Sequence, residues 1–533
     1  MIKPKQKLAL FSILSIWVLS TILLTVATSA FAQNQSQGTN LYSQIQLFSE
    51  VLQKLKQYYV KDLSDEELIK AAINGMLSSA DPHTTYFTAS EFQDFTTSTK
   101  GAFGGLGIQI DKIGDYVTVV SPIEGTPAYR MGITAGDKII KVNGESVVGL
   151  STDEAIKRMR GDVGTPVEIT ISRPGVSAPM NFNIIRETIK IKSVPYFFKL
   201  SNGTGYLRIT QFNENTSSEL RTALTSLEAD GITGLIIDLR FNPGGLLDQA
   251  VDTVNEFIGQ NRLVVETKGR IENKQLYTRY ATKERTYPII VLVNEASASA
   301  SEIFAGSLQD WDKGLVMGKN TFGKGSVQQL IPLSNGNGIK ITTSYYYIKS
   351  GRCIHKMSND KLLKGQQLSE TELKTEDEKN HKQIYYTANK RKVYGGGGIT
   401  PDIISESDFL TMFGAELRRK NTFFNFTVDY LVAHDHQVPA NFEVNDALMD
   451  EFLSYVKKQE IKYTSADLDS ANAYIRNTLK SEIVRKLHGD QEAYKVTISQ
   501  DKQLMEAIDL FNRFHTMKEL FDYAARSKKE DVE

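Results

Sequence analysis

The chain has 533 residues, of which 41% are hydrophobic, and this length is sufficient for several domains. Lysine and arginine total 62 against 63 for aspartate and glutamate, so the charge balance gives no reason to expect a nucleic-acid partner. The single cysteine, Cys353, leaves no internal disulfide, and the seven histidines form no ligand pattern, so we expect neither a metal nor another cofactor.

The N-terminus has the order of a secretory signal peptide. Lys3, Lys5 and Lys7 precede the uncharged residues 8–28, and a small-x-small pattern follows at 30–32. We therefore interpret residues 1–32 as a signal segment and expect an exported protein of the periplasm or cell envelope. The apolar stretch is almost long enough to span a bilayer, so membrane association through an uncleaved N-terminal anchor stays an alternative.

Residues 40–94 predict a small helical segment. Helical periodicity runs through residues 41–77, and Ser64 followed by Glu67 forms a capping-box pattern. The segment closes with the motif DPHTTYF, which begins at Asp81. Because Asp-Pro initiates turns, this motif favours a turn over a catalytic role for His83.

Residues 95–190 change to short strands separated by Gly, Asn and Asp, and they resemble a PDZ domain over nearly its full length. The glycine-rich sequence before the first strand and the sequence AGDKI at 135–139 carry the resemblance. In such domains the glycine-rich loop presents N–H groups to a peptide's C-terminal carboxylate, and the peptide adds as a strand. A dinucleotide site is excluded, since no helix follows these glycines. The peptide-binding residues that the resemblance implies are Gly104, Gly105, Leu106, Gly107 and Ile108.

Residues 191–405 alternate strand and helix patterns, which predicts a layered α/β core. A buried-looking strand at 234–240 runs into a turn containing Gly244 and Gly245 and then a helix, and the pattern recurs at 289–299 and more loosely at 315–328. A glycine turn at a helix start directs N–H groups at an anion, so both glycines are plausible oxyanion donors. We interpret residues 395–403 as the loop that ends this core.

Two segments of this core suggest chemistry. Ser297, Ser299 and Ser301 stand among alanines at a strand-to-helix turn, and Lys324 lies between two glycines after another short apolar run. Serine is a poor nucleophile until a base takes its proton, and a desolvated lysine is such a base. The pair therefore suggests serine–lysine hydrolysis. A phosphate loop ending at Lys324 is excluded, because Gly325 replaces the Ser or Thr that would bind magnesium.

As a set, these motifs resemble the C-terminal processing, or tail-specific, serine peptidases. DPHTTYF, the PDZ-like region, FNPGG, SASASEIFAGSLQD, FGKGSVQ, SGRCI and GGGITPDI occur in that order over about residues 40–405. The family core resembles the crotonase fold, so the resemblance implies a multidomain α/β protein whose PDZ domain precedes a crotonase-like layered peptidase core. Residues 406–533, helix-rich and aromatic, lie outside the resemblance, and we interpret them as a separate helical domain.

The resemblance also implies roles for individual residues. In that family the middle serine is the nucleophile, here Ser299, and the lysine of the second motif is the general base, here Lys324. A glutamine four residues later, here Gln328, orients the lysine. The backbone N–H of Ala300, with one from Gly244 or Gly245, would hold the oxyanion. Lysine must be neutral to act as a base, and burial can lower its pKa from the reference of about 10.4.

These observations predict an exported serine endopeptidase that recognises the free C-termini of protein or peptide substrates through its PDZ domain and cleaves peptide bonds near them. The alternative is a PDZ-bearing peptide-binding scaffold whose hydrolase core is silent or activated by a partner. A regulatory partner and a homo-oligomer are both left open by the sequence.

Overall fold

The computed structural model describes residues 41–356, 383–406, 410–434, 438 and 442–530. The chain divides into two compact units, residues 1–79 and 80–533. Within the described ranges no helix combines the length and the apolar character needed to cross a membrane. The predicted signal segment, residues 1–32, lies outside the described residues.

The first unit contains helix α2 (Leu41–Tyr58) and all but the last residue of helix α3 (Asp65–Ala80). The Ser64 hydroxyl accepts the Glu67 N–H at 3.1 Å and donates to the Glu67 carboxylate at 2.9 Å. This confirms the predicted capping box, which begins α3 at Asp65.

A turn opens the second unit. The Asp81 carboxylate accepts the backbone N–H groups of His83 and Thr84 at 2.7 and 2.9 Å, which confirms the turn predicted for the DPHTTYF motif. Strand β1 (Thr85–Phe87) and helix α4 (Ala89–Lys100) follow.

The region expected to be a PDZ domain forms an antiparallel sheet in the order β3-β4-β5-β7-β8, with β6 paired to β5. Alternating apolar residues fill its own core, which includes Val117, Ile139 and Ile169. Strand β3 lies at the sheet edge, so one of its sides is not paired within the sheet. The elements are β3 (Ile108–Ile113), β4 (Tyr116–Pro122), α5 (Pro127–Arg130), β5 (Lys138–Val142), β6 (Glu145–Ser146), α6 (Thr152–Met159), β7 (Pro166–Ser172) and β8 (Met180–Ile185), flanked by the paired strands β2 (Ala102–Gly105) and β9 (Glu187–Lys190).

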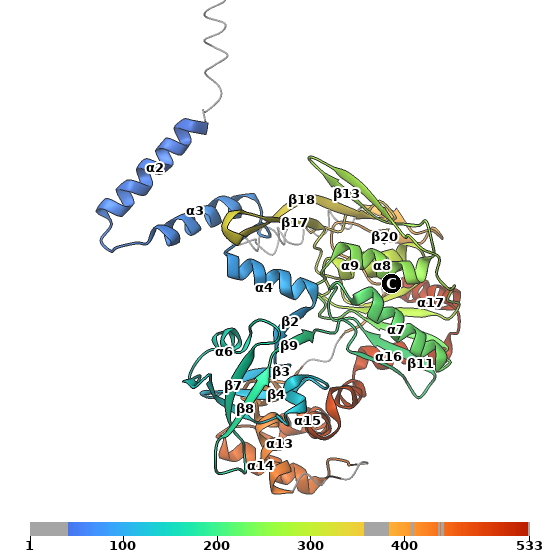
Figure 1. The fold of residues 1–533 in the computed structure, drawn as a ribbon. Helices are drawn as coiled ribbons and strands as arrows, with labels where there is room; N and C mark the ends of the chain where they lie inside the picture. The colour runs from blue at the N-terminus through green and yellow to red at the C-terminus, as the bar shows by residue number, and fades with distance from the viewer. Residues whose placement is uncertain (1–40, 357–382, 407–409, 435–437, 439–441, 531–533) are drawn as a thin grey trace, which may run out of the picture. The chain divides into compact units, whose positions relative to one another are not determined.

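The next region is built on a six-stranded sheet (Figure 1). Its strands, in spatial order, are β10 (Tyr196–Lys199), β11 (Thr204–Arg208), β12 (Gly234–Asp238), β15 (Ile289–Val293), β16 (Leu315–Gly318) and β21 (Ile403–Ile404). All neighbours are parallel except β10 and β11. Asp238 is in register with Leu292, and Val293 with Gly318, so β12, β15 and β16 end together. The loops that follow these strands therefore meet at one edge of the sheet.

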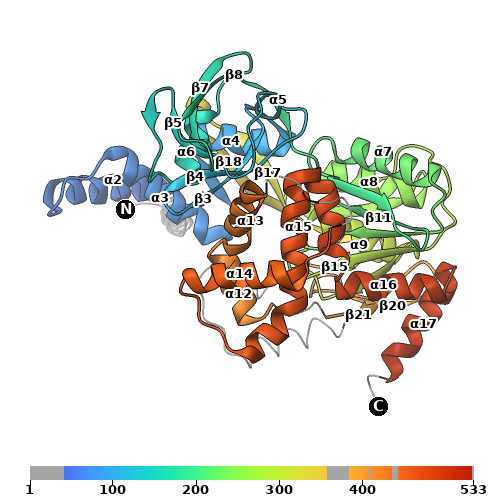
Figure 2. The same cartoon turned by 90° about the horizontal axis from the view of Figure 1, so that it is seen from below.

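Both faces of this sheet are buried. Leu235, Ile237 and Val291 belong to a core shared with helices α7 (Thr216–Ala229), α8 (Leu247–Ile258) and α9 (Ala300–Asp310). The alternate residues Ile236 and Ile290 pack with α16 (Lys502–Arg513) and α17 (Met517–Glu530) on the opposite face (Figures 1 and 2). The near-continuous apolar strands follow from this double cover, because no residue of a central strand can face water.

A second, antiparallel sheet adjoins the first one along the chain. Its strands lie in the spatial order β1-β18-β13-β14, and β17 also pairs with β18. The new strands are β13 (Leu263–Gly269), β14 (Asn273–Tyr277), β17 (Ser326–Pro332) and β18 (Gly338–Ile348). A 3₁₀ turn at Ser334–Gly336 connects β17 to β18. The sequence predicted a third strand–turn–helix unit at 315–328, and this prediction was wrong. Strand β16 is followed by another strand, β17, because the segment beyond Lys324 pairs with β18. Ile403, expected at the end of a closing loop (395–403), instead begins the short strand β21 beside β16.

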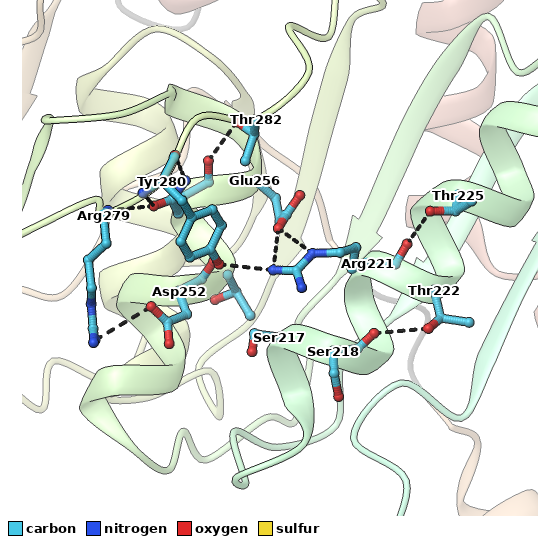
Figure 3. Close-up of polar contacts among 12 residues, drawn as sticks. Ser217, Ser218, Arg221, Thr222, Thr225, Asp252, Glu256, Arg279, Tyr280 and Thr282 are labelled. Atoms are coloured by element: carbon cyan, nitrogen blue, oxygen red, sulfur yellow. Dashed lines mark hydrogen bonds and ion pairs between the residues drawn. The ribbon is translucent and has the colours of Figure 1, made fainter.

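The extended segment between β14 and β15 is tied to α7 and α8 by the contacts in Figure 3. Arg221 of α7 donates to the Glu256 carboxylate at 3.0 and 3.1 Å and to the Tyr280 hydroxyl at 3.1 Å. Tyr280 in turn donates to the Asp252 carbonyl at 3.2 Å. These contacts fasten the segment to helices α7 and α8.

The last region is helical. Residues of α12, α13, α14 and most of α15 enclose a core of their own, whereas Tyr494 and the residues beyond it join the second face of the six-stranded sheet. Helix α15 contains a non-helical residue, Gly489, shortly before this change of partner. The remaining elements are β19 (Ile384–Tyr386), β20 (Lys392–Tyr394), α12 (Met412–Arg419), α13 (Thr422–Ala433), α14 (Asp446–Lys458) and α15 (Ser465–Ile498). The domain boundaries drawn from the sequence stay predictions.

Candidate active site

Three loops meet at the carboxyl edge of the six-stranded sheet. The loop after β12 contains Gly244 and Gly245, the loop after β15 contains Ser299, and the loop after β16 contains Lys324. The common end of the three strands explains why segments about 80 residues apart in sequence approach one another.

Ser299 differs from the serines on either side of it. Its backbone has φ 57° and ψ −115°, a conformation that costs a non-glycine residue about 1–3 kcal/mol and that clusters at functional sites. Ser297 and Ser301 are fully buried, and their hydroxyls donate to the carbonyls of Leu239 and Asn242 at 2.9 and 3.0 Å. The hydroxyls of those two serines are therefore used by the fold, and Ser299, at the N-cap of α9, is the half-buried serine of the three.

The expected oxyanion donors lie beside the serine. A Cβ atom on Gly244 would stand 2.8 Å from both the Ser299 Cβ and the Ala300 nitrogen, so only glycine permits this approach. The Gly244 N–H, however, donates to the Asn242 side-chain oxygen at 2.8 Å. Within the described ranges neither the Gly245 nor the Ala300 N–H donates a hydrogen bond. The two groups left for an oxyanion are therefore those of Gly245 and Ala300.

Lys324 is half-buried in the loop between the two sheets. Burial, and then the nearby ammonium of Lys340, lower the pKa of Lys324, whereas the carboxylates of Glu302 and Asp81 act in the opposite direction. The net direction is the one that a general base needs, because a lower pKa increases the neutral fraction near pH 7.

Glu302 connects the serine and lysine loops. Its carboxylate accepts the N–H groups of Ser299 and Lys324 on one oxygen at 2.8 and 2.9 Å. The other oxygen accepts the Gly323 N–H at 2.7 Å and the Thr321 hydroxyl at 2.5 Å. Burial raises the pKa of Glu302, and these four donated hydrogen bonds oppose that rise. One buried side chain thus holds both loops.

Tyr346 of β18 connects the same two loops. Its fully buried hydroxyl lies 2.6 Å from the Lys324 carbonyl oxygen and 3.1 Å from that of Ser299. The N–H groups of Ser299 and Lys324 therefore both donate to Glu302, and their carbonyl oxygens both lie next to the Tyr346 hydroxyl.

Gln328 follows in strand β17, where a bulge between Val327 and Gln328 sets it opposite Thr342. Its amide nitrogen donates to the hydroxyls of Ser326 and Thr342 at 2.9 and 3.3 Å. Its amide oxygen has no hydrogen-bond partner in the part of the chain that the structure describes.

Sequence reasoning missed four residues around the site: Glu302, Tyr346, Thr342 and His355. Glu302 had a usable signal, because Ser299 and Glu302 have the Ser-x-x-Glu spacing of a capping box. His355, whose Nδ1 accepts the Gly325 N–H at 3.3 Å, has no local signal. Tyr346 and Thr342 have none either, since only the pairing of β17 with β18 brings them to the site.

The residues expected to bind peptide lie around the start of β3. Gly104 and Gly105 are part of β2, in register with Thr188 and Glu187 of β9. Leu106 and Gly107 form the turn into β3, and within the described residues their N–H groups donate no hydrogen bond. Ile108 begins the edge strand β3. Free N–H groups at the start of an edge strand are what a peptide carboxylate and an added strand require.

Comparison with known proteins agrees with this architecture. A model of peptidase family S41 matches residues 203–360, a PDZ-domain model matches residues 118–173, and a model of a family of unknown function, DUF8443, matches residues 413–489. The PDZ prediction is confirmed by the second match.

Named proteins are similar to a larger part of this chain than the family models cover. A carboxy-terminal-processing protease of Bartonella bacilliformis is 42% identical over 342 residues, which cover 63% of this chain and 77% of that protein. The carboxy-terminal processing protease CtpA of Bacillus subtilis is 34% identical over 66% of this chain and 76% of its own. Among solved structures, the photosystem II D1 C-terminal processing protease is 26% identical, with a TM-score of 0.37, over 67% of this chain and 86% of that one. The identity and coverage of the Bartonella and Bacillus relatives show that the chain belongs to peptidase family S41, among the serine-type carboxy-terminal-processing proteases with a PDZ domain.

Proposed function

We propose that the protein hydrolyses peptide bonds with a Ser299–Lys324 dyad, assisted by Gln328. The observation that carries the proposal is the shared attachment of the two loops, in which Glu302 accepts both N–H groups and Tyr346 contacts both carbonyl oxygens. Such an arrangement fixes the distance between the nucleophile and its base more tightly than two independent loops could.

The reaction follows from these groups. Neutral Lys324 Nζ takes the proton of Ser299 Oγ while Oγ bonds to the substrate carbonyl carbon. The N–H groups of Gly245 and Ala300 stabilise the negative oxygen. The Lys324 ammonium then gives its proton to the leaving amine nitrogen as the C–N bond breaks. Lys324 then takes a proton from water as the water oxygen attacks the acyl carbon, and the Lys324 ammonium returns that proton to Ser299 Oγ as the C–Oγ bond breaks and the second product leaves.

An active-site probe tests the dyad on the purified full-length protein. A fluorophosphonate should label the wild type and fail to label Ser299→Ala, and Lys324→Ala should lose both labelling and peptide hydrolysis, because each side chain depends on the other. Lys313→Ala is the matched control, since Lys313 is a lysine of the same domain outside the site. Labelling of Ser299→Ala would exclude Ser299 as the nucleophile, and an unlabelled, inactive wild type would favour the silent scaffold.

We further propose that the PDZ domain selects substrates by their free C-terminus. The unpaired side of β3 and the N–H groups of Leu106 and Gly107 support it. Amidating the C-terminus of a good substrate should weaken its processing, because the amide removes the negative charge that those N–H groups would bind. Equal cleavage of the acid and amide forms would remove the PDZ domain from recognition.

A variant of the loop gives an independent test. Gly107 has φ 78°, and a Cβ there would stand 2.2 Å from the Thr126 Cβ. Gly107→Ala should therefore lower the affinity for a free-acid peptide by at least about tenfold and leave hydrolysis of a short amidated peptide unchanged. Gly114→Ala is the control, since Gly114 has a similar φ of 63° but nothing within 4 Å of its Cβ position.

Export is part of the proposal and rests on the signal-peptide pattern of residues 1–32 alone. N-terminal sequencing of the protein recovered from cell fractions tests it. A new N-terminus near residue 33 in the envelope fraction supports cleavage, whereas an intact N-terminus in the membrane fraction supports an anchor. Recovery of the intact chain from the cytoplasm would contradict export.

A further inference from the structure

The DPHTTYF motif, interpreted from the sequence as an ordinary turn, reaches the candidate active site. The Asp81 carboxylate accepts two backbone N–H groups within the turn, and its other oxygen accepts the Thr84 hydroxyl at 2.7 Å. The Asp81 carboxylate also makes a hydrogen bond outside the turn: the Thr342 hydroxyl of β18 donates to Asp81 Oδ1 at 3.2 Å. The Thr342 N–H also donates to the Thr84 hydroxyl at 3.1 Å, so the motif holds Thr342 at two atoms.

The charge on Asp81 determines the direction of the next hydrogen bond. Burial acts to raise the pKa of Asp81, but the hydrogen bonds from Thr84, His83 and Thr342 outweigh it and lower the pKa, so the group is ionised. An ionised carboxylate can only accept, and a hydroxyl has a single proton. The proton of Thr342 is therefore directed at Asp81, and only a lone pair of Thr342 is left for its other neighbour.

That neighbour is the Gln328 amide, 3.3 Å away. Because Thr342 can only accept from it, the amide must present its nitrogen to Thr342 and its oxygen to the opposite side. The oxygen is the amide atom without a partner in the described part of the chain. An amide oxygen can accept from the N–H groups of a neutral lysine and leave the lysine lone pair for the serine proton, whereas a reversed amide would offer only donors.

We propose that Thr342, oriented by Asp81, is a positioning residue that fixes which end of the Gln328 amide serves Lys324. The inference rests on the proposed Ser299–Lys324–Gln328 function and adds residues from a motif that the mechanism does not otherwise use.

A pair of variants at Thr342 tests whether its hydroxyl positions the Gln328 amide. Thr342→Val keeps the shape of the side chain and removes the hydroxyl; it should lower kcat by about 10-fold or more with KM nearly unchanged, part of the about 10²–10⁴-fold that a positioned base contributes. Thr342→Ser restores the hydroxyl and should recover most of the loss. Thr343→Val is the matched control on the same strand and should stay within about twofold of the wild type, since adjacent strand residues face opposite sides.

A double-mutant cycle shows whether Thr342 acts through Gln328 or whether its substitution lowers kcat by disturbing the structure more generally. Once Gln328→Ala has removed the amide, Thr342→Val should cost no more than about twofold further, because the two side chains act through one another. If the two losses multiply instead, or if Thr342→Val keeps the wild-type kcat, the inference is wrong. Activity in Lys324→Ala would overturn the proposed function itself, which is a different result.

The charge of Asp81 provides a second readout that does not depend on the Thr342 variants. Asp81→Asn removes the negative charge that directs the Thr342 proton but keeps an oxygen that can still accept it, so kcat should fall, by less than in Thr342→Val. The charged groups that act on Lys324 are Lys340, Glu302 and Asp81. Since Asp81 raises the pKa of Lys324, its neutralisation should move the rise of kcat/KM to lower pH. Lys340→Met should move that rise to higher pH. A wild-type kcat with an unshifted pH profile in Asp81→Asn, or shifts of the opposite sign, would contradict the assignment.

Discussion

The serine loop and the lysine loop reach the same place by different means. The serine loop follows a strand whose five residues are all buried and runs directly into a helix that is buried along its length. Its position is set by side chains close in sequence, such as Ser297, which also accepts the Asn294 N–H at 3.0 Å. Small residues make this possible, because they let the loop pack against Gly244 of the neighbouring loop.

The lysine loop, by contrast, joins two different sheets and depends on remote residues. Glu302 holds it from α9, Tyr346 from β18, and His355 from the chain beyond β18. The comparison teaches that the proposed nucleophile is positioned to a larger extent by residues near it in sequence than the proposed base, which depends mainly on tertiary contacts. Substitutions far from the site should therefore disturb the base more than the nucleophile.

The largest expected effect is at Glu302, where the two loops are joined. Glu302→Gln keeps the volume but turns one acceptor oxygen into a donor that faces two other donors. We expect a loss of kcat/KM of at least about 100-fold and of about 2–4 kcal/mol in the free energy of unfolding. Hydrolysis assays and urea unfolding measure the two effects. Glu295→Gln, an exposed glutamate of the serine loop, is the control. Wild-type activity in Glu302→Gln would mean that the loops do not need this connection.

The second effect concerns the loop that contains Gly244, proposed to hold the oxyanion, and the helices that cover the far face of the sheet. Arg240 donates to Asp238 at 2.7 Å, and to Asp501 and Gln503 at 2.9 Å each, next to the loop that contains Gly244. Arg240→Ala should cost about 3–5 kcal/mol, since it leaves the fully buried Asp238 without its cation.

Asp501→Ala should cost less, about 1–2 kcal/mol, because Asp501 is partly exposed and also caps α16. It should in addition lower kcat, if α16 supports the oxyanion loop through Arg240. Asn445→Ala is the control, since Asn445 caps α14 in the same way away from the sheet. Equal effects of Asp501→Ala and Asn445→Ala on kcat would confine the role of Asp501 to stability.

The third effect is the pH dependence of the base. Only neutral Lys324 can accept the serine proton, so kcat/KM should rise with pH through one apparent pKa below the ordinary lysine value of 10.5. A rate profile on the wild type measures it. Chemical modification of histidine is a poor control, because buried His355 supports the lysine loop. His355→Gln, which keeps an acceptor for Gly325, should retain the profile; a changed apparent pKa in that variant would point to the histidine as the base.

The smallest effect is at the serines beside the nucleophile. Ser301→Ala removes one buried hydrogen bond to a carbonyl oxygen, which should cost about 1 kcal/mol. Ser297→Ala removes such a bond and also the acceptor of the Asn294 N–H, so it should cost about 1–3 kcal/mol. Both variants should keep most activity. Thermal unfolding and hydrolysis assays on both variants measure this. An inactive but folded Ser301→Ala would mean that the nucleophile had been assigned to the wrong serine.

The sequence by itself determined the features that depend on neighbours along the chain. The Ser64–Glu67 capping box, the Asp81 turn and the strand before Ser299 depend on local hydrogen bonds and on apolar runs, so their residues could be read directly. The ordered motifs were also enough to predict the family, because each motif is a short, nearly contiguous stretch. The choice of Ser299 among three serines came from the family resemblance, and only the backbone geometry supplies a physical reason for it.

Only the tertiary structure determined the secondary structure, the contacts and the burial of the lysine loop and the segments around it. A strand was missed after Lys324 because its pairing partner lies beyond a turn and its alternating pattern is weak, with exposed and half-buried residues mixed. The same pairing brings Thr342, Tyr346 and Asp81 to the site, although Asp81 and Thr342 are 261 positions apart. Burial of Lys324 likewise depends on what packs over it. Hydrogen-bond partners and desolvation are properties of the assembled fold, so no local pattern in the sequence could specify them.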